Sequence, residues 1–139
     1  MGTRATIAIK TETGEIKSIY VGHDGYPSHT GKTLIENYNN PEMAENLIRL
    51  GDLSFLDKNL EPDETKPHEF GYKKSQPNVT LAYHRDNNES WADTKPNIYN
   101  TIQGWRDSNN YTKYYYLFID GQWTLNGSPI TELTFEFDN

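Results

Sequence analysis

Short segments rich in hydrophobic residues, several of them alternating with polar residues, have the period of two that is typical of β-strands. The first two are separated by a polar stretch that contains Gly14, which predicts an N-terminal β-hairpin. Near the end of the chain, Asp120-Gly121 separates two further segments and predicts a tight hairpin turn. The predicted strands are residues 3–10, 16–21, 79–85, 113–120, 122–125 and 132–137.

Two consecutive segments have the spacing of helices instead. Residues 32–39 predict a short helix that ends at an Asn-Asn pair. Pro41 suits the first position of a second helix, residues 41–50, because its fixed φ matches a helix start. Gly51 follows and suits the residue just past a helix end.

The rest of the chain is less regular. Residues 57–78 are rich in proline, lysine and acidic residues and predict a long surface loop, residues 86–97 predict turns, and residues 98–105 predict a short helix. Strands at both ends with helices grouped early predict an α+β fold, with a mostly antiparallel sheet and two short helices at about 30–50. We expect the sheet to combine an N-terminal hairpin, a central strand and a C-terminal hairpin, in a single domain of residues 1–139.

Composition limits the classes of function. Of the 139 residues, 34% are hydrophobic and 13% aromatic, so tyrosine and tryptophan must fill much of the core and also suit binding surfaces. The formal net charge of −7 disfavours binding to a nucleic-acid backbone, although a few focused arginines could hold a small anion. No apolar run approaches the roughly 20 residues of a membrane helix, and the first residues are too polar for a signal peptide. We therefore expect a cytoplasmic protein that binds neither nucleic acid nor membranes.

The first dense group of candidate residues is the stretch IYVGHDGYPSHTGKTL, residues 19–34. His23 titrates near neutrality and Asp24 could orient it, but neighbours in an extended segment point in opposite directions. The stretch is therefore either a turn in which His23 bonds locally or one wall of a pocket. A phosphate-binding loop is excluded, because Tyr26 occupies the position of its first glycine. The chain has no cysteine, and its four histidines lack the spacing of metal ligands, so we expect no metal.

The second dense group is YHRDNNESW, residues 83–91. Arg85 could hold a phosphate through its two-pronged guanidinium, and Tyr83 or Trp91 could stack on a base. Asp86 could accept hydrogen bonds from ribose hydroxyls. The alternative is a surface turn formed by Arg85 and Asp86, with Trp91 anchored in the core.

Several blocks of the sequence resemble, in order, those of a small family found in phages and prophages. The blocks are MGTRATIAI, IYVGHDGYPSHTGKTLIENY, LIRLGDLSFL, LAYHRDNNESW and YYYLFIDGQW. They span almost the whole chain, and together they are more specific than any one alone. The resemblance is to the phage anti-Thoeris sponges. Thoeris is a bacterial defence in which a TIR enzyme makes a cyclic ADP-ribose isomer as an alarm signal.

This resemblance implies an anti-defence protein in the host cytoplasm that binds the cyclic nucleotide tightly and does not cleave it. It also implies a homo-oligomer, a dimer or larger, with ligand pockets at subunit contacts. No cofactor and no catalytic residue are expected. A ligand with a pyrophosphate, two riboses and a purine needs cationic, aromatic and acidic groups. The expected ligand-binding residues are Arg4, His23, Asp24, Tyr26, Tyr83, Arg85, Asp86 and Trp91.

Two other classes of function stay open. One is a protein-binding inhibitor of a host defence enzyme that mimics the charge of nucleic acid, although the acidic residues are scattered among 13 basic ones. The other is a hydrolase of a phosphodiester or glycosidic bond that uses His23 or His84. An enzyme would change the ligand on incubation, whereas a sponge would return it intact.

Overall fold

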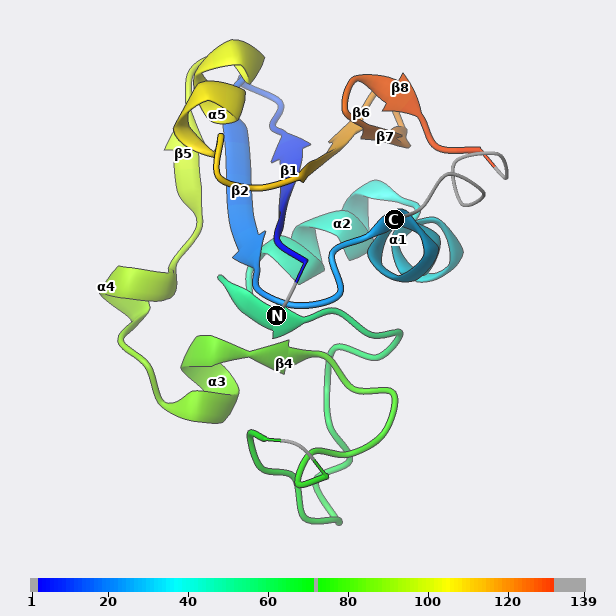
Figure 1. The fold of residues 1–139 in the computed structure, drawn as a ribbon, viewed down its shortest axis with the longest axis vertical. Helices are drawn as coiled ribbons and strands as arrows, with labels where there is room; N and C mark the ends of the chain where they lie inside the picture. The colour runs from blue at the N-terminus through cyan, green and yellow to red at the C-terminus, as the bar shows by residue number, and fades with distance from the viewer. Residues whose placement is uncertain (1–2, 72, 132–139) are drawn as a thin grey trace.

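A single mixed sheet organises the molecule (Figure 1). The computed structural model describes residues 3–71 and 73–131. The strand order is β4-β3-β2-β1-β6-β7-β8, and β5 also pairs with β2. The pairs β1–β6 and β2–β3 are parallel and the others antiparallel, which confirms the predicted α+β class. The strands are β1 (Ala5–Lys10), β2 (Ile16–Val21), β3 (Leu53–Phe55), β4 (Leu81–Ala82), β5 (Asn97–Tyr99), β6 (Tyr114–Ile119), β7 (Gln122–Leu125) and β8 (Ser128–Pro129).

The helices are short, and two of them follow the N-terminal hairpin as expected. Asn40 caps α2, because its side chain accepts a hydrogen bond from the Met43 N–H (2.9 Å), and Gly51 adopts a positive φ of 78° just past its end. The helices are α1 (Lys32–Asn37), preceded by the π-helical turn η1 (Pro27–Gly31), then α2 (Pro41–Ile48), α3 (Tyr83–Asn87), α4 (Trp91–Thr94) and α5 (Ile102–Ser108).

Strand alternation divides the buried side chains between the two faces of the sheet. Ala5, Ile7 and Ile9 of β1 join the larger core with residues of α1 and α2, whereas Ala8 joins a smaller core with Trp105 of α5. Figure 1 shows α5 beside β5 and β2 at one end of the sheet, whereas α1 and α2 lie away from that end. The helix α2 packs against β1 and β2. The N-terminal hairpin forms as predicted. The predicted turn between β6 and β7 also forms, and Asp120 and Gly121 there have φ values of 53° and 80°.

Two predicted elements are wrong in part. The strand predicted at residues 79–85 is only two residues long, because the Asp86 carboxylate accepts the Ala82 N–H (2.8 Å) and α3 begins directly afterwards. The helix predicted at residues 98–105 is shifted toward the C-terminus, because β5 extends through Tyr99 and the Thr101 hydroxyl accepts the Gly104 N–H at the start of α5 (2.9 Å). The strand predicted at residues 132–137 lies outside the described residues.

Within residues 3–71 and 73–131, no helix combines the length and the apolar character that crossing a lipid bilayer requires.

Candidate functional site

The sheet face opposite α1 and α2 is covered by α5 only at one end. There, Trp105 packs with Ala8 and donates its indole N–H to the Thr6 hydroxyl (3.1 Å). By strand alternation Arg4 belongs to the same face as Thr6, and Arg4 is exposed. Tyr111, which follows α5, is 54% exposed. The part of the face next to Arg4 and Tyr111, which α5 does not cover, is therefore accessible to a ligand.

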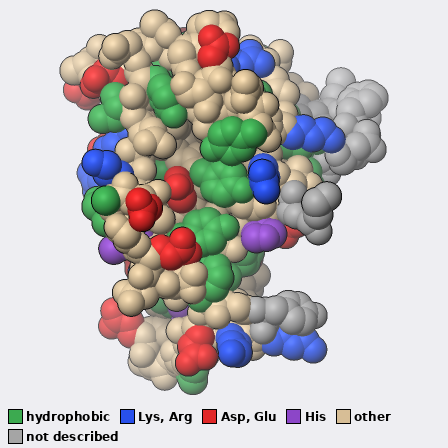
Figure 2. Space-filling view, turned by 60° about the vertical axis from the view of Figure 1, so that its left-hand side comes forward, with side chains coloured by type: hydrophobic (Ala, Val, Ile, Leu, Met, Phe, Trp, Pro, Cys, Tyr) green, Lys and Arg blue, Asp and Glu red, His purple; other side chains and the backbone are tan. Residues whose placement is uncertain are grey.

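Three tyrosines meet at the accessible end, and we call them the tyrosine face: Tyr20, Tyr83 and Tyr111. The Tyr20 and Tyr111 rings lie 6.0 Å apart, and the Tyr83 ring lies 5.8 Å from Phe70. Tyr20 and Tyr83 both approach Gly22, just past the end of β2. Figure 2, which brings forward the side of the molecule with α3, α4 and β5, shows a column of hydrophobic side chains with acidic, basic and histidine side chains beside it. Rings arranged in this way suit stacking on a flat ligand.

Arg4 and His23 provide positive or proton-donating groups beside the tyrosine face. Arg4 is close enough to Tyr111 for its charge to oppose the rise in the Tyr111 pKa that burial causes. His23 is exposed, and its Nδ1 lies 3.2 Å from the Ser54 carbonyl oxygen and 3.3 Å from the Ser54 hydroxyl. A carbonyl can only accept, so Nδ1 holds the proton and donates, which leaves Nε2 as an acceptor in the neutral ring.

Asp52 fills a gap in the sheet behind the tyrosine face. Along the outer edge of β2, β5 pairs with residues 16–18 and β3 pairs at Val21. Between these partners the Tyr20 N–H donates to the Asp52 carboxylate (2.9 Å). Burial raises the pKa of Asp52 to about 6, Glu89 contributes in the same direction, and the hydrogen bond from Tyr20 opposes the rise. Burial also raises the pKa of Tyr83, and the charges of Glu89 and Asp52 add to that rise.

The two other predicted residues of the first dense group lie apart from the tyrosine face. Asp24 is exposed at a turn with a φ of 56°, and its backbone carbonyl accepts the Thr30 hydroxyl (2.7 Å). Tyr26 packs against the larger core and contacts His29, with ring centroids 6.2 Å apart. The stretch around Asp24 is therefore a hydrogen-bonded turn, and His23 is its member that reaches the tyrosine face.

Arg85 and Asp86 connect α3 to the long loop, residues 57–78, through hydrogen bonds inside the protein, and we call this pair the clasp. Arg85 donates to the carbonyls of Leu60 (2.6 Å) and Thr80 (2.9 Å) and, through two nitrogens, to Asp86 (3.0 Å each). The Asp86 side chain is only 4% exposed and also lies 3.4 Å from Nε2 of His68. Because its donors already have partners inside the protein, Arg85 has little capacity left for a phosphate.

Trp91 and His84 lie together on the outer side of α3 and α4. Their ring centroids are 5.2 Å apart, and His84 Nδ1 donates to the Glu89 carbonyl (2.7 Å). Trp91 is 40% exposed and also lies against Gly51. Trp91 thus serves partly as packing and keeps one surface accessible. Among the described residues, no three acidic or histidine side chains come together as a metal site would require.

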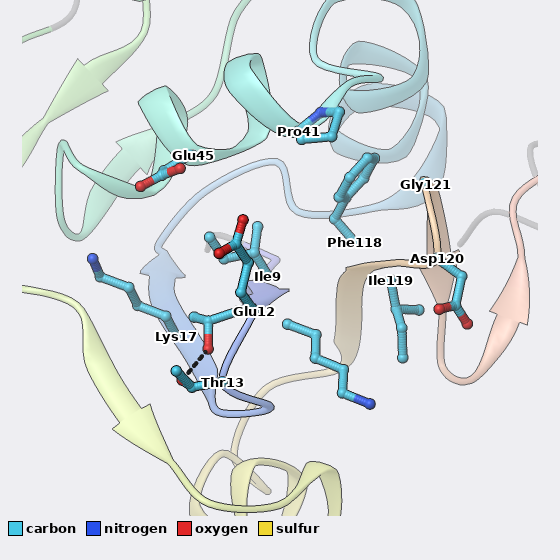
Figure 3. A pocket seen from close by; sticks show the side chains of 12 residues that line it. Ile9, Glu12, Thr13, Lys17, Pro41, Glu45, Phe118, Ile119, Asp120 and Gly121 are labelled. Atoms are coloured by element: carbon cyan, nitrogen blue, oxygen red, sulfur yellow. Dashed lines mark hydrogen bonds between the residues drawn. The ribbon is translucent and has the colours of Figure 1, made fainter.

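A separate groove lies at the far end of the sheet, where the two hairpin turns approach the start of α2. It has a volume of about 570 Å³, and none of the predicted ligand-binding residues lines it. Its walls mix both signs of charge, with Lys17, Glu12 and Asp120 around the apolar Ile9 and Phe118 (Figure 3). Such a mixture gives no indication of one ligand class.

The structure thus brings together Arg4, His23 and Tyr83 and adds residues that sequence reasoning missed: Tyr20, Asp52, Ser54 and Tyr111. Tyr20 had a signal, because it is a large aromatic residue on the face of β2 opposite Ile19 and Val21. Asp52 and Ser54 had none, because their roles depend on contacts with residues about 30 positions away.

Comparisons of the sequence with protein-family models and with curated proteins, and of the structure with solved structures, find no match.

Proposed function

We propose that this protein binds an intact cyclic nucleotide, a cyclic ADP-ribose isomer made by a TIR enzyme, and sequesters it in the host cytoplasm as a phage anti-defence protein. The observation that supports this most directly is the meeting of Arg4 and His23 with the tyrosine face. The resemblance of the sequence blocks to the anti-Thoeris sponges supplies the identity of the ligand class.

Each part of such a ligand has a suitable group at the site. The Arg4 guanidinium matches a pyrophosphate oxygen, and its hydrogen bond to a charged group would contribute about 1.5–3 kcal/mol. Tyr20 and Tyr111 offer ring faces to a purine. The carboxylates of Asp52 and Glu89, which lie close enough to interact, are acceptors for ribose hydroxyls or an exocyclic amino group.

Binding without cleavage is favoured by the surroundings of His23. The hydrogen bonds of its Nδ1 go to Ser54 and not to a carboxylate. A general base oriented by an acid is the usual arrangement for hydrolysis, and His23 lacks that orienting group among its contacts in the described residues. The accessible face would also allow a second copy of the chain to close over the ligand, as the resemblance implies.

The test is to incubate the purified protein with the products that a TIR enzyme makes from NAD⁺, remove unbound molecules, denature the protein by heat and analyse the released molecule by chromatography. We expect an unmodified cyclic ADP-ribose isomer. Arg4→Ala should reduce capture by about 10- to 150-fold in affinity, the equivalent of ~1.5–3 kcal/mol. Arg49→Ala is the matched control, because Arg49 is an exposed arginine that pairs with Glu45 on α2.

Release of a hydrolysed product would indicate the enzyme instead. Absence of any captured nucleotide, with full binding to a host defence protein, would indicate the acidic inhibitor. Equal losses for Arg4→Ala and Arg49→Ala would remove the tyrosine face as the site.

A further inference from the structure

We propose that the Tyr83 hydroxyl is a pre-oriented hydrogen-bond donor for a ligand oxygen, and that Gly22 is the positioning residue that makes room for it. The role of the ligand oxygen rests on the proposed function above, whereas the role of Gly22 does not depend on it.

Gly22 is required for space and not for backbone conformation. Its φ is not among the positive values found at Gly14, Gly51 and other glycines, so an L-residue could adopt its backbone geometry. A Cβ added at Gly22 would lie 2.5 Å from the Tyr83 hydroxyl oxygen, much closer than atoms of this kind approach. The same Cβ would lie 3.5 Å from the Tyr20 ring and 3.7 Å from the Ser54 carbonyl, which are ordinary contacts. A side chain at position 22 would therefore overlap with one atom, the hydroxyl oxygen of Tyr83.

The hydrogen bonds around Ser54 determine where the proton of the Tyr83 hydroxyl points. The His23 Nδ1–H donates toward the Ser54 hydroxyl, which thus acts as an acceptor there (3.3 Å). Tyr83 is the second side-chain partner of Ser54. Because the Ser54 hydroxyl accepts from His23, we assign its own proton to the bond with the Tyr83 oxygen. The proton of Tyr83 is then left to point away from Ser54. Because Ser54 is buried, this order of donors and acceptors is protected from water.

The ring itself is held from the other side. Phe70 of the long loop contacts the Tyr83 ring, at 5.8 Å between centroids, and the Tyr83 N–H donates to the Asp52 carbonyl (3.1 Å). The backbone of Tyr83 is thus fixed, so a methyl group at position 22 would tilt the ring and displace its hydroxyl without unfolding the chain. A fixed donor of this kind selects a ligand with an acceptor oxygen, such as a phosphoryl oxygen or a ribose hydroxyl.

The first experiment needs no ligand. Protein labelled with ¹³C at the tyrosine Cζ atoms is measured by NMR, and the Tyr83 signal is assigned by its loss in Tyr83→Phe. Gly22→Ala should move the Tyr83 signal strongly and leave the remote Tyr38 signal in place. Gly104→Ala is the matched control, since a Cβ there would approach only the Thr101 hydroxyl within 4 Å, at 3.1 Å. An unchanged Tyr83 signal in Gly22→Ala would overturn the positioning role.

The second experiment measures affinity for the TIR product captured above. Tyr83→Phe and Gly22→Ala should each weaken binding by about 2- to 12-fold, the value of one neutral hydrogen bond. In the Tyr83→Phe background, Gly22→Ala should have no further effect, because the displaced atom is already absent. Additive losses, or full affinity in Tyr83→Phe, would overturn the donor role. If the wild-type protein binds no nucleotide, the proposed function and the donor role fail, and the NMR result alone decides the role of Gly22.

Discussion

Tyr83 and Arg85 are two positions apart on α3, yet they belong to regions with different properties. Arg85 faces the long loop, where carbonyl groups and Asp86 occupy its donors. Tyr83 faces the end of β2, where the rings of the tyrosine face lie beside exposed groups. The difference shows that residue type alone does not identify a binding group. An arginine surrounded by internal acceptors stabilises the fold, and an arginine at an accessible edge, such as Arg4, is available to a ligand.

The largest expected effect is the loss of the clasp. Arg85→Ala would leave the carbonyls of Leu60 and Thr80 without this donor and the buried Asp86 carboxylate without its guanidinium partner, so the free energy of unfolding should fall by about 3–5 kcal/mol. Chemical denaturation measures this loss. Ligand affinity of the fraction that remains folded should stay close to that of the wild type. If the Arg85→Ala protein were as stable as the wild type but no longer bound nucleotide, Arg85 would be a ligand-binding residue and not part of the structural clasp.

A smaller loss of stability is expected at Gly25, which contrasts with Gly22. A Cβ at Gly25 would lie 2.6 Å from the Ala5 Cβ and 2.9 Å from the Thr3 carbonyl oxygen, so it would meet β1 and its N-terminal flank directly. Gly25→Ala should therefore destabilise the protein by about 1–3 kcal/mol, whereas Gly22→Ala displaces only the end of a side chain. Thermal unfolding of the two variants, measured side by side, tests the contrast, and equal melting temperatures would contradict it.

The pH dependence of the free energy of unfolding should reveal the raised pKa of Asp52. Its folded-state pKa of about 6 lies above the ordinary value for an aspartate, so its contribution to stability is fully present at low pH and is lost as pH rises through about 6. Lowering the pH from 7.5 to 5 should therefore add less stability to Asp52→Asn than to the wild type. The asparagine keeps an oxygen acceptor for the Tyr20 N–H. Melting temperatures across this range provide the measurement, and identical slopes would show that Asp52 titrates normally.

The smallest effect on stability is expected for His23→Ala. The side chain is exposed, so the change in unfolding free energy should stay within about 0.5 kcal/mol. Affinity for the captured TIR product should fall by a few-fold, to about the extent of one neutral hydrogen bond. Isothermal titration calorimetry separates the two readouts. A loss of stability with unchanged affinity would mean that His23 only secures the turn.

Much of the sheet could be predicted from sequence because its signals are local. The alternation in β1 and β2 and the Asp120-Gly121 turn depend on neighbouring residues, and all three formed as expected. The predicted strand at residues 79–85 failed because the Asp86 carboxylate bonds back to the Ala82 N–H, a side-chain effect that hydrophobicity patterns do not register.

The candidate site was less predictable, because its groups are separated in sequence. The internal role of Arg85 depends on a carbonyl 25 positions away, which no local pattern indicates. Tyr83 and His23 both occur in the dense groups of the sequence, but their connection through Ser54 follows only from the pairing of β3 beside β2.

The break along the outer edge of β2 has a consequence for hydrogen exchange. At Tyr20 a carboxylate takes the place of the neighbouring backbone that accepts amide protons elsewhere in the ladder. The hydrogen-exchange rate of the Tyr20 amide should therefore change with the protonation of Asp52. Measured against pH, this rate would report the charge of the carboxylate that lies behind the tyrosine face.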